Sequence, residues 1–359
     1  MVQSRHIQNR RKGDMTDMTL YAPPILFDRN AHRVPFLVRV ADLMWCGAGL
    51  SCFQALPSRD GVIIPTAVYT VTLPLIHSVG LFDPGHEAIG EDFHHLLKCY
   101  FGTHGRLAIE SIPSPASQCN VMSSLSGVRG WIYSHHARYV QALRHMWGCL
   151  DTGYAVQQWR KLGTKRKGTI TRTRKMSHTE LELRLSQYQQ HGDQGVKLTL
   201  RNAVLFTRIF EAHFLPIHLF LVIICSGVYS SIPHPQVQCR ILTMSFDFTA
   251  ILRGLSYMIM IGYFAICYER YHRVCVQARA AEMKRAGLFE ELKGDFTFRD
   301  RLNPVNYLDY VIFPVAGTMY GSVALLHAAF AHFWTDRLNY KVSAKPTRVV
   351  ASLLDAREV

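Results

Sequence analysis

Residues 90–101 read GEDFHHLLKCYF, and this stretch predicts the helix around which the rest of the amino-terminal half is arranged. From about residue 91 to 101, apolar side chains recur at intervals of three and four, the pattern of one buried helix face. Glu91 and Asp92 stand at the amino end, where free backbone N–H groups and the helix dipole stabilise a carboxylate. Two roles fit Asp92: a cap of the helix, or a general base beside a glycine that leaves room for substrate.

A second helix is predicted for residues 137–154, ARYVQALRHMWGCLDTGY. Apolar side chains cover one side, whereas Gln141, Arg144 and His145 share the other side with Gly148. Gln141 and Arg144 are three residues apart, so their head groups meet on one surface. An amide beside a guanidinium suits sugar hydroxyls or a diphosphate, although an ordinary solvated helix face would carry the same residues.

The composition indicates a membrane portion and an acidic partner. Of the 359 residues, 48% are hydrophobic and 18% are charged, against roughly 25% charged in soluble globular proteins. The net charge of +14 suits a nucleic acid, an anionic membrane surface or a nucleotide diphosphate. Residues 159–175 are rich in Lys and Arg, but no aromatic platform accompanies them, so we expect no nucleic-acid partner. The nine cysteines show no C-x-x-C pair, which predicts free thiols.

Three apolar runs in the second half are each close to the roughly twenty residues that cross a bilayer. They predict membrane spans at about 212–230, 248–268 and 310–333, and hence a multi-pass membrane protein. Basic residues gather before the first run and between the second and third, so the positive-inside rule places the amino-terminal half in the cytosol. Three spans would place the carboxyl-terminal tail outside, but the basic residues after the third run argue against that position. The side of the membrane on which the tail lies therefore stays open.

These patterns divide the chain into parts with different properties. The expected fold class is α+β with a membrane region. We expect a disordered basic arm at 1–19, a folded half at 20–158, a basic cytosolic linker with an amphipathic helix at 159–208, a transmembrane region at 209–335 and a tail at 336–359.

Taken in order, the two helical motifs resemble those of the family 2 glycosyltransferases of the cellulose and hyaluronan synthase type. That family carries a TED or GED motif followed by Q-x-x-R-W, and here GEDFHHLLKCYF precedes RYVQALRHMWG. The stretches APPILFDRNAHRVPFLVRVADLMW, VGLFD, SPASQCNV and HFWTDRLNY resemble a fungal membrane-bound branch. The resemblance covers residues 20–340, and it implies a partial GT-A-type catalytic half followed by a bundle of about three transmembrane helices.

Carried over residue by residue, the resemblance makes Asp92 the general base that removes the acceptor hydroxyl proton, with Glu91 as its motif neighbour. Gln141 and Arg144 would help to hold acceptor and donor. His145 stands where the family has an aromatic residue, and Trp147 follows two places later. The implied function is inverting transfer of a sugar from a nucleotide-sugar to a glycan or lipid acceptor, as in polysaccharide synthesis.

One family feature is missing from this sequence. Family members bind a divalent metal, Mg²⁺ or Mn²⁺, on a D-x-D motif, and no D-x-D occurs in this sequence. We therefore expect a chain without the donor-nucleotide half and without metal ligands of its own. Two alternatives to an active transferase remain: a catalytically inert membrane paralogue or assembly partner, and a membrane transporter.

Overall fold

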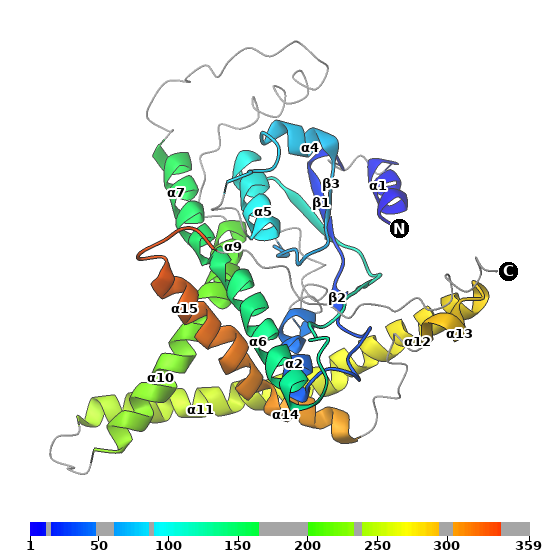
Figure 1. The fold of residues 1–359 in the computed structure, drawn as a ribbon. Helices are drawn as coiled ribbons and strands as arrows, with labels where there is room; N and C mark the ends of the chain where they lie inside the picture. The colour runs from blue at the N-terminus through cyan, green and yellow to red at the C-terminus, as the bar shows by residue number, and fades with distance from the viewer. Residues whose placement is uncertain are drawn as a thin grey trace.

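The computed structural model is mostly helical, with a small sheet formed by the amino-terminal half (Figure 1). The middle of the predicted linker, residues 165–199, and the tail from residue 339 onward lie outside the residues that it describes. The structure describes residues 1–11, 16–47, 61–85, 90–164, 200–232, 239–293 and 304–338.

The described residues contain the short strands β1 (Thr19–Ala22), β2 (Ile25–Leu26), β3 (Thr70–Val71), β4 (Ala108–Ser111) and β5 (Ala116–Ser117). Strand β1 is the centre of a three-stranded sheet, parallel to β4 and antiparallel to β3. Strands β2 and β5 form a separate parallel pair. Leu20 of β1 is fully buried opposite Ile109 of β4, and a one-residue slip would turn such apolar side chains to the wrong face.

The helices of the amino-terminal half are α1 (Val2–Arg11), α2 (Phe36–Ala41), α4 (Leu73–Ser78), α5 (Glu91–Gly102), α6 (Gly127–Met146) and α7 (Asp151–Thr164), with 3₁₀ turns η1 (Thr16–Met18) and η3 (Trp147–Leu150). Helix α5 confirms the helix predicted at 91–101. The single helix predicted for 137–154 is wrong in its bounds. Gly127, at φ +65°, starts α6 earlier, and the tight turn η3 separates α6 from α7.

The first residues differ from the disordered arm that the sequence predicts. They form α1, and this helix contacts the sheet through His6, whose Nδ1 is 3.2 Å from the Tyr21 hydroxyl on β1, and through a carboxylate on β4. Glu110 accepts hydrogen bonds from Arg5 Nε at 3.0 Å and from Asn9 Nδ2 at 2.5 Å. Composition alone does not show this partner, which lies far along the chain.

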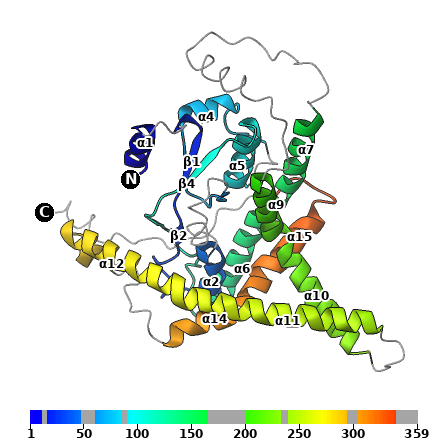
Figure 2. The ribbon, with the colours of Figure 1, turned by 180° about the vertical axis from the view of Figure 1, so that it is seen from behind.

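The helices of the second half are α9 (Leu200–His213), α10 (Leu215–Ser230), α11 (Arg240–Tyr263), α12 (Glu269–Arg285), α13 (Phe289–Leu292), α14 (Pro304–Gly317) and α15 (Val323–Ala331), with π-helical turns η6 (Phe264–Tyr268) and η8 (Thr318–Ser322). Helices α11 and α12 join through η6 into one continuous rod that crosses the molecule (Figure 2). Helices α14 and α15 join through η8 in the same way.

Two of these continuous helices, residues 240–285 and 307–331, are long and apolar enough to cross a membrane. A third candidate arises if α9 and α10, which are bent by 50° at their junction, form one span. The apolar runs predicted at 212–230, 248–268 and 310–333 fall on these helices. Helices α10 and α11 bury none of their residues within the chain, so their apolar surfaces are left for another apolar environment.

Two hydrophobic cores hold the chain together. One lies between the sheet, α5, α7 and α9, and it includes Leu20, Leu96 and Leu205, each fully buried. The other lies between α2, α6 and the α14–α15 helix, and it includes Met146 and Leu325. Burial of each such side chain contributes about 1.5–3 kcal/mol. Both cores use α6 or its continuation α7, so this helical segment connects the sheet to the candidate membrane helices.

Candidate functional site

The carboxylate of Asp92 is held in one orientation at the start of α5. Its Oδ1 accepts a hydrogen bond from the backbone N–H of Phe93 at 2.8 Å, and its Oδ2 accepts one from Ala67 N–H at 3.0 Å. The neighbouring Glu91 accepts from the hydroxyl of Tyr69 at 2.7 Å. Burial, and then the Glu91 carboxylate, raise the pKa of Tyr69, so this hydroxyl stays protonated and donates. Both motif carboxylates therefore have fixed donors from the segment before β3.

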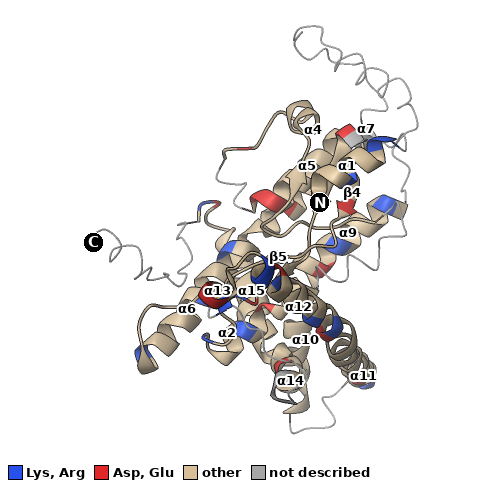
Figure 3. Cartoon of the chain, turned by 90° about the vertical axis from the view of Figure 1, so that its right-hand side faces the viewer, with Lys and Arg blue, Asp and Glu red and all other residues tan. Residues whose placement is uncertain are grey.

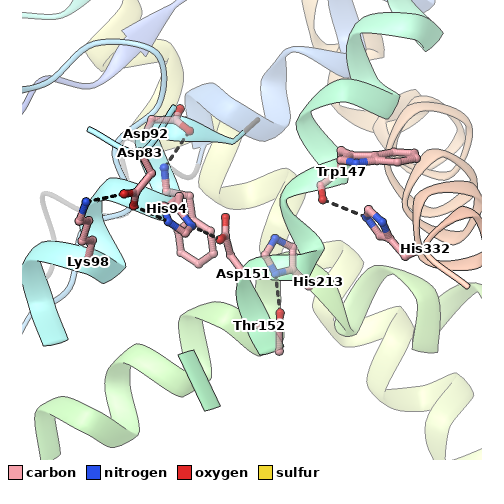
Figure 4. A network of polar contacts seen from close by, with 10 residues as sticks. Asp83, Asp92, His94, Lys98, Trp147, Asp151, Thr152, His213 and His332 are labelled. Atoms are coloured by element: carbon pink, nitrogen blue, oxygen red, sulfur yellow. Dashed lines mark hydrogen bonds and ion pairs between the residues drawn. The ribbon is translucent and has the colours of Figure 1, made fainter. Parts of the chain in front are cut away.

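One turn further along α5, His94 lies between two carboxylates (Figure 4). Its Nδ1 is 2.5 Å from Asp151 Oδ1 of α7, and its Nε2 is 3.1 Å from Asp83 Oδ2. Lys98 Nζ donates to the other oxygen of Asp83 at 2.6 Å. The hydrogen bond to Asp151 raises the pKa of His94 despite its burial, and a protonated ring donates from both nitrogens. We call Asp83, His94, Lys98 and Asp151 the α5 network.

The two sequence motifs meet at a pair of glycines. A Cβ atom on Gly90, the residue before α5, would lie 3.4 Å from the Cα of Gly148 in η3. Asp151 Oδ2 is near both glycines, is buried, and has no hydrogen-bond partner in the described residues. Burial raises the pKa of Asp151, and His94 opposes this effect. The start of the GED helix therefore packs backbone to backbone against the end of the Q-x-x-R helix.

His145 points from α6 towards the segment that follows α2. The ring of His145 packs edge-on against Trp45 with centroids 5.3 Å apart. Burial, then Arg138 and Arg144, lower the pKa of His145 to about 3, so its ring is neutral. Gln141 is buried, and its Oε1 has no hydrogen-bond partner in the described part of the chain. Arg144 is half-buried, with one guanidinium nitrogen 3.5 Å from His145 Nε2.

A buried ion pair lies on the same face of α6, and the sequence analysis missed it. Arg138, which is 0% exposed, places Nη2 2.9 Å from Asp42 Oδ1, and its guanidinium lies 5.5 Å from the ring centroid of Tyr320. Burial raises the pKa of Asp42 to about 6, although Arg138 opposes this shift. One feature of the sequence could have indicated Arg138: it precedes Gln141 by three residues, so it lies on the same face of the helix. We call Asp42, Trp45, Arg138, Gln141 and His145 the α6 seam.

Trp147 contacts the residues that follow α15. Its indole Nε1 donates to the carbonyl of Asp336 at 3.2 Å, and its ring centroid is 4.3 Å from that of His332. In Figure 4, Asp92 lies beside Asp83 and His94 of the α5 network, whereas Trp147 lies apart from them with His332. The structure therefore brings the ends of the two motifs together, whereas the ring of Trp147 packs against the carboxyl end of α15.

The described residues do not fit the divalent metal that the resemblance implies. They contain no group of three or more His, Cys, Asp or Glu side chains placed to hold a metal ion. The α5 network has two carboxylates, but its His94 ring already bridges them with both nitrogens. A cation would have to displace the His94 ring from both carboxylates.

A comparison with protein families assigns the chain to one of them. The family model described as glycosyl transferase family group 2 matches residues 9–268, from α1 to the end of η6. Because this match covers more than half of the chain, the protein belongs to that family, whose members use nucleotide-sugar donors. No curated protein and no solved structure matches the chain.

Proposed function

We propose that this chain acts in the transfer of a sugar from a nucleotide-sugar to a hydroxyl of a glycan or lipid acceptor at a membrane, with Asp92 as the general base. Family membership supports the donor class and the reaction class. The candidate membrane helices support a membrane location with several spans. A cytosolic position of the folded half is the orientation that the basic residues favour.

The contact of Gly90 with Gly148 is the observation that carries the proposal. It places the start of the GED helix against Gly148, which follows Arg144 of the Q-x-x-R motif by four residues. Neither glycine has a side chain, so the two backbones approach closely, two residues before Asp92. Two backbone donors orient that carboxylate in advance, which is what a base on a rigid element requires.

In the proposed reaction the acceptor hydroxyl loses its proton to Asp92 while its oxygen forms a bond to the anomeric carbon. The bond from that carbon to the nucleotide diphosphate breaks, and the diphosphate leaves with the electron pair. One base on one face implies inversion at the anomeric carbon. Such a base contributes typically about 10²–10⁴-fold in rate. Gln141 and Arg144 are the proposed ligands of acceptor and donor, and no step is assigned to a metal.

Asp92→Asn in the complete protein tests this role. We expect transfer from labelled nucleotide-sugars in membranes to fall by at least about 100-fold, because asparagine keeps the shape but cannot accept the proton. Glu211→Gln, which changes an exposed carboxylate on α9 that pairs with Arg208, is the matched control.

Normal transfer by Asp92→Asn, at normal protein levels in the membrane, would remove Asp92 from the mechanism. A wild-type protein that transfers no sugar, tested with a panel of donors, would instead favour the inert paralogue or assembly partner.

A further inference from the structure

A cavity of about 600 Å³ opens at the amino-terminal end of α6, far from the junction of the two motifs. Its walls come from the turn before α2, the loop before α6 and the first two turns of α6. Along the helix, Gly130 in its wall is about 27 Å from Gly148, at 1.5 Å per residue. The cavity is therefore separate from the proposed sugar-transfer site.

The polar groups that line this cavity are those that bind an oxyanion. Arg33 is the charged residue of the lining, and four serines line it as well, including Ser126 and Ser134. The lining contains no Asp or Glu. Ser126 precedes the helix without capping it through its side chain, so the first turn of α6 adds its partial positive charge. A guanidinium with hydroxyl donors is suited to a phosphate group.

An apolar patch continues from the mouth of the cavity. Leu125 and Trp131 line the cavity and are 52% and 54% exposed, and Val128, Ile132 and Tyr133 extend the patch at more than half exposure. Tryptophan and tyrosine beside aliphatic residues are typical of the membrane–water interface. This end of α6 lies at the edge of the molecule (Figure 3). The site therefore combines a phosphate-binding pocket with an exposed surface for hydrocarbon.

The helix that carries the patch packs against a candidate membrane span. Helix α6 runs along the α14–α15 helix, where His135 hydrogen-bonds to the hydroxyl of Tyr320, and Tyr139 bonds to His327 Nδ1 at 3.0 Å. The exposed apolar end of α6 is thus held beside a helix that is apolar enough to cross a bilayer.

We propose that this cavity binds the phosphate of an anionic phospholipid, whose acyl chains lie over the apolar patch. Arg33 and the serines bind the phosphate oxygens, and Trp131 contacts the start of the chains. The site would fix the position of α6 relative to the membrane surface. This proposal is independent of the sugar-transfer function.

The test measures binding of phosphatidylglycerol to the purified full-length protein in detergent, by native mass spectrometry, with inorganic phosphate as a soluble competitor. We expect Arg33→Gln to weaken phosphatidylglycerol binding by about tenfold, since a hydrogen bond to a charged group is lost. Trp131→Ser should also weaken it. The control is Arg129→Gln. Arg129 is an exposed arginine in the same turn of α6 as Trp131, and it does not line the cavity, so this variant should bind lipid as the wild type does.

Thermal unfolding of each variant confirms that it is folded before binding is measured. Unchanged lipid binding by Arg33→Gln would overturn the proposal. An equal loss in Arg129→Gln would also overturn it, because the attraction would then be non-specific. Displacement of the lipid by millimolar inorganic phosphate, with no effect of Trp131→Ser, would show a phosphate site that does not select lipid.

Discussion

The α5 network and the α6 seam are both buried clusters of charged and polar side chains, yet they differ in how their groups are satisfied. In the network both ring nitrogens of His94 contact carboxylates. In the seam, Asp42 Oδ2, Gln141 Oε1 and several nitrogens have no hydrogen-bond partner in the described residues. Buried groups of this kind are usually satisfied by water or by a ligand. The network leaves one such atom, Asp151 Oδ2, whereas the seam leaves several, so the seam has more capacity for a further polar partner.

Of the changes to these two regions, disruption of the Arg138–Asp42 ion pair in the seam should lower the stability of the fold most. Arg138→Met leaves the Asp42 carboxylate buried without its cation, and removal of one partner of a buried ion pair costs about 3–5 kcal/mol. Thermal unfolding in detergent measures the loss. The double variant Arg138→Met/Asp42→Leu should recover most of it, because no charge is then left uncompensated. A double variant as unstable as the single one would mean that the seam is held by packing around Arg138 rather than by charge.

The α5 network provides a pH-dependent contrast. The pKa of His94 is raised in the folded chain, so its contribution to stability is complete below its unfolded pKa of about 6.5 and is lost as the pH rises through the folded value. At pH 6 the melting temperature of His94→Gln should be lower than that of the wild type. Between pH 6 and pH 9 it should fall less than the wild-type value does.

His136→Gln, which changes an exposed histidine on α6, should keep the wild-type pH dependence. Parallel pH curves for the wild type and His94→Gln would show that the charge of His94 does not hold α5 to α7.

The smallest effect is expected at the junction between the two regions. In Gly148→Ala the new methyl would lie 3.8 Å from both Asp151 Oδ2 and the Cα of Gly90, which is ordinary van der Waals distance. Stability should change by less than about 1 kcal/mol. Gly153→Ala, in open space on α7, is the control and should gain up to about 1 kcal/mol from helix propensity. A large loss in Gly148→Ala alone would mean that the two motifs are packed too closely to admit a methyl group.

The parts of the fold that follow from local periodicity were predictable. The spacing of apolar residues located α5, and the apolar runs located the candidate spans. The end of α6 at Met146 was not predictable, because Trp147 continues the apolar pattern although its indole bonds to a carbonyl near the end of the described chain.

In the candidate site, too, some residues were predictable from the sequence and others were not. Asp92 and Gln141 were predicted from motif spacing, and their roles stay predictions. The partners of His94 and Arg138 were not, because Asp151 and Asp42 come from other helices or their ends and a single sequence does not show which distant residues pair. Arg138 was especially difficult to recognise, since an arginine on a mixed helix face is normally solvated.

The continuous helix of residues 240–285 has a mechanical consequence. Its 46 residues span about 69 Å, more than twice the roughly 30 Å thickness of bilayer hydrocarbon. Its far half, α12, carries Arg279, which pairs with Asp28 directly after β2. Because the helix is continuous, a tilt of its apolar half would also move α12. Through the Arg279–Asp28 ion pair, that movement would reach the segment after β2.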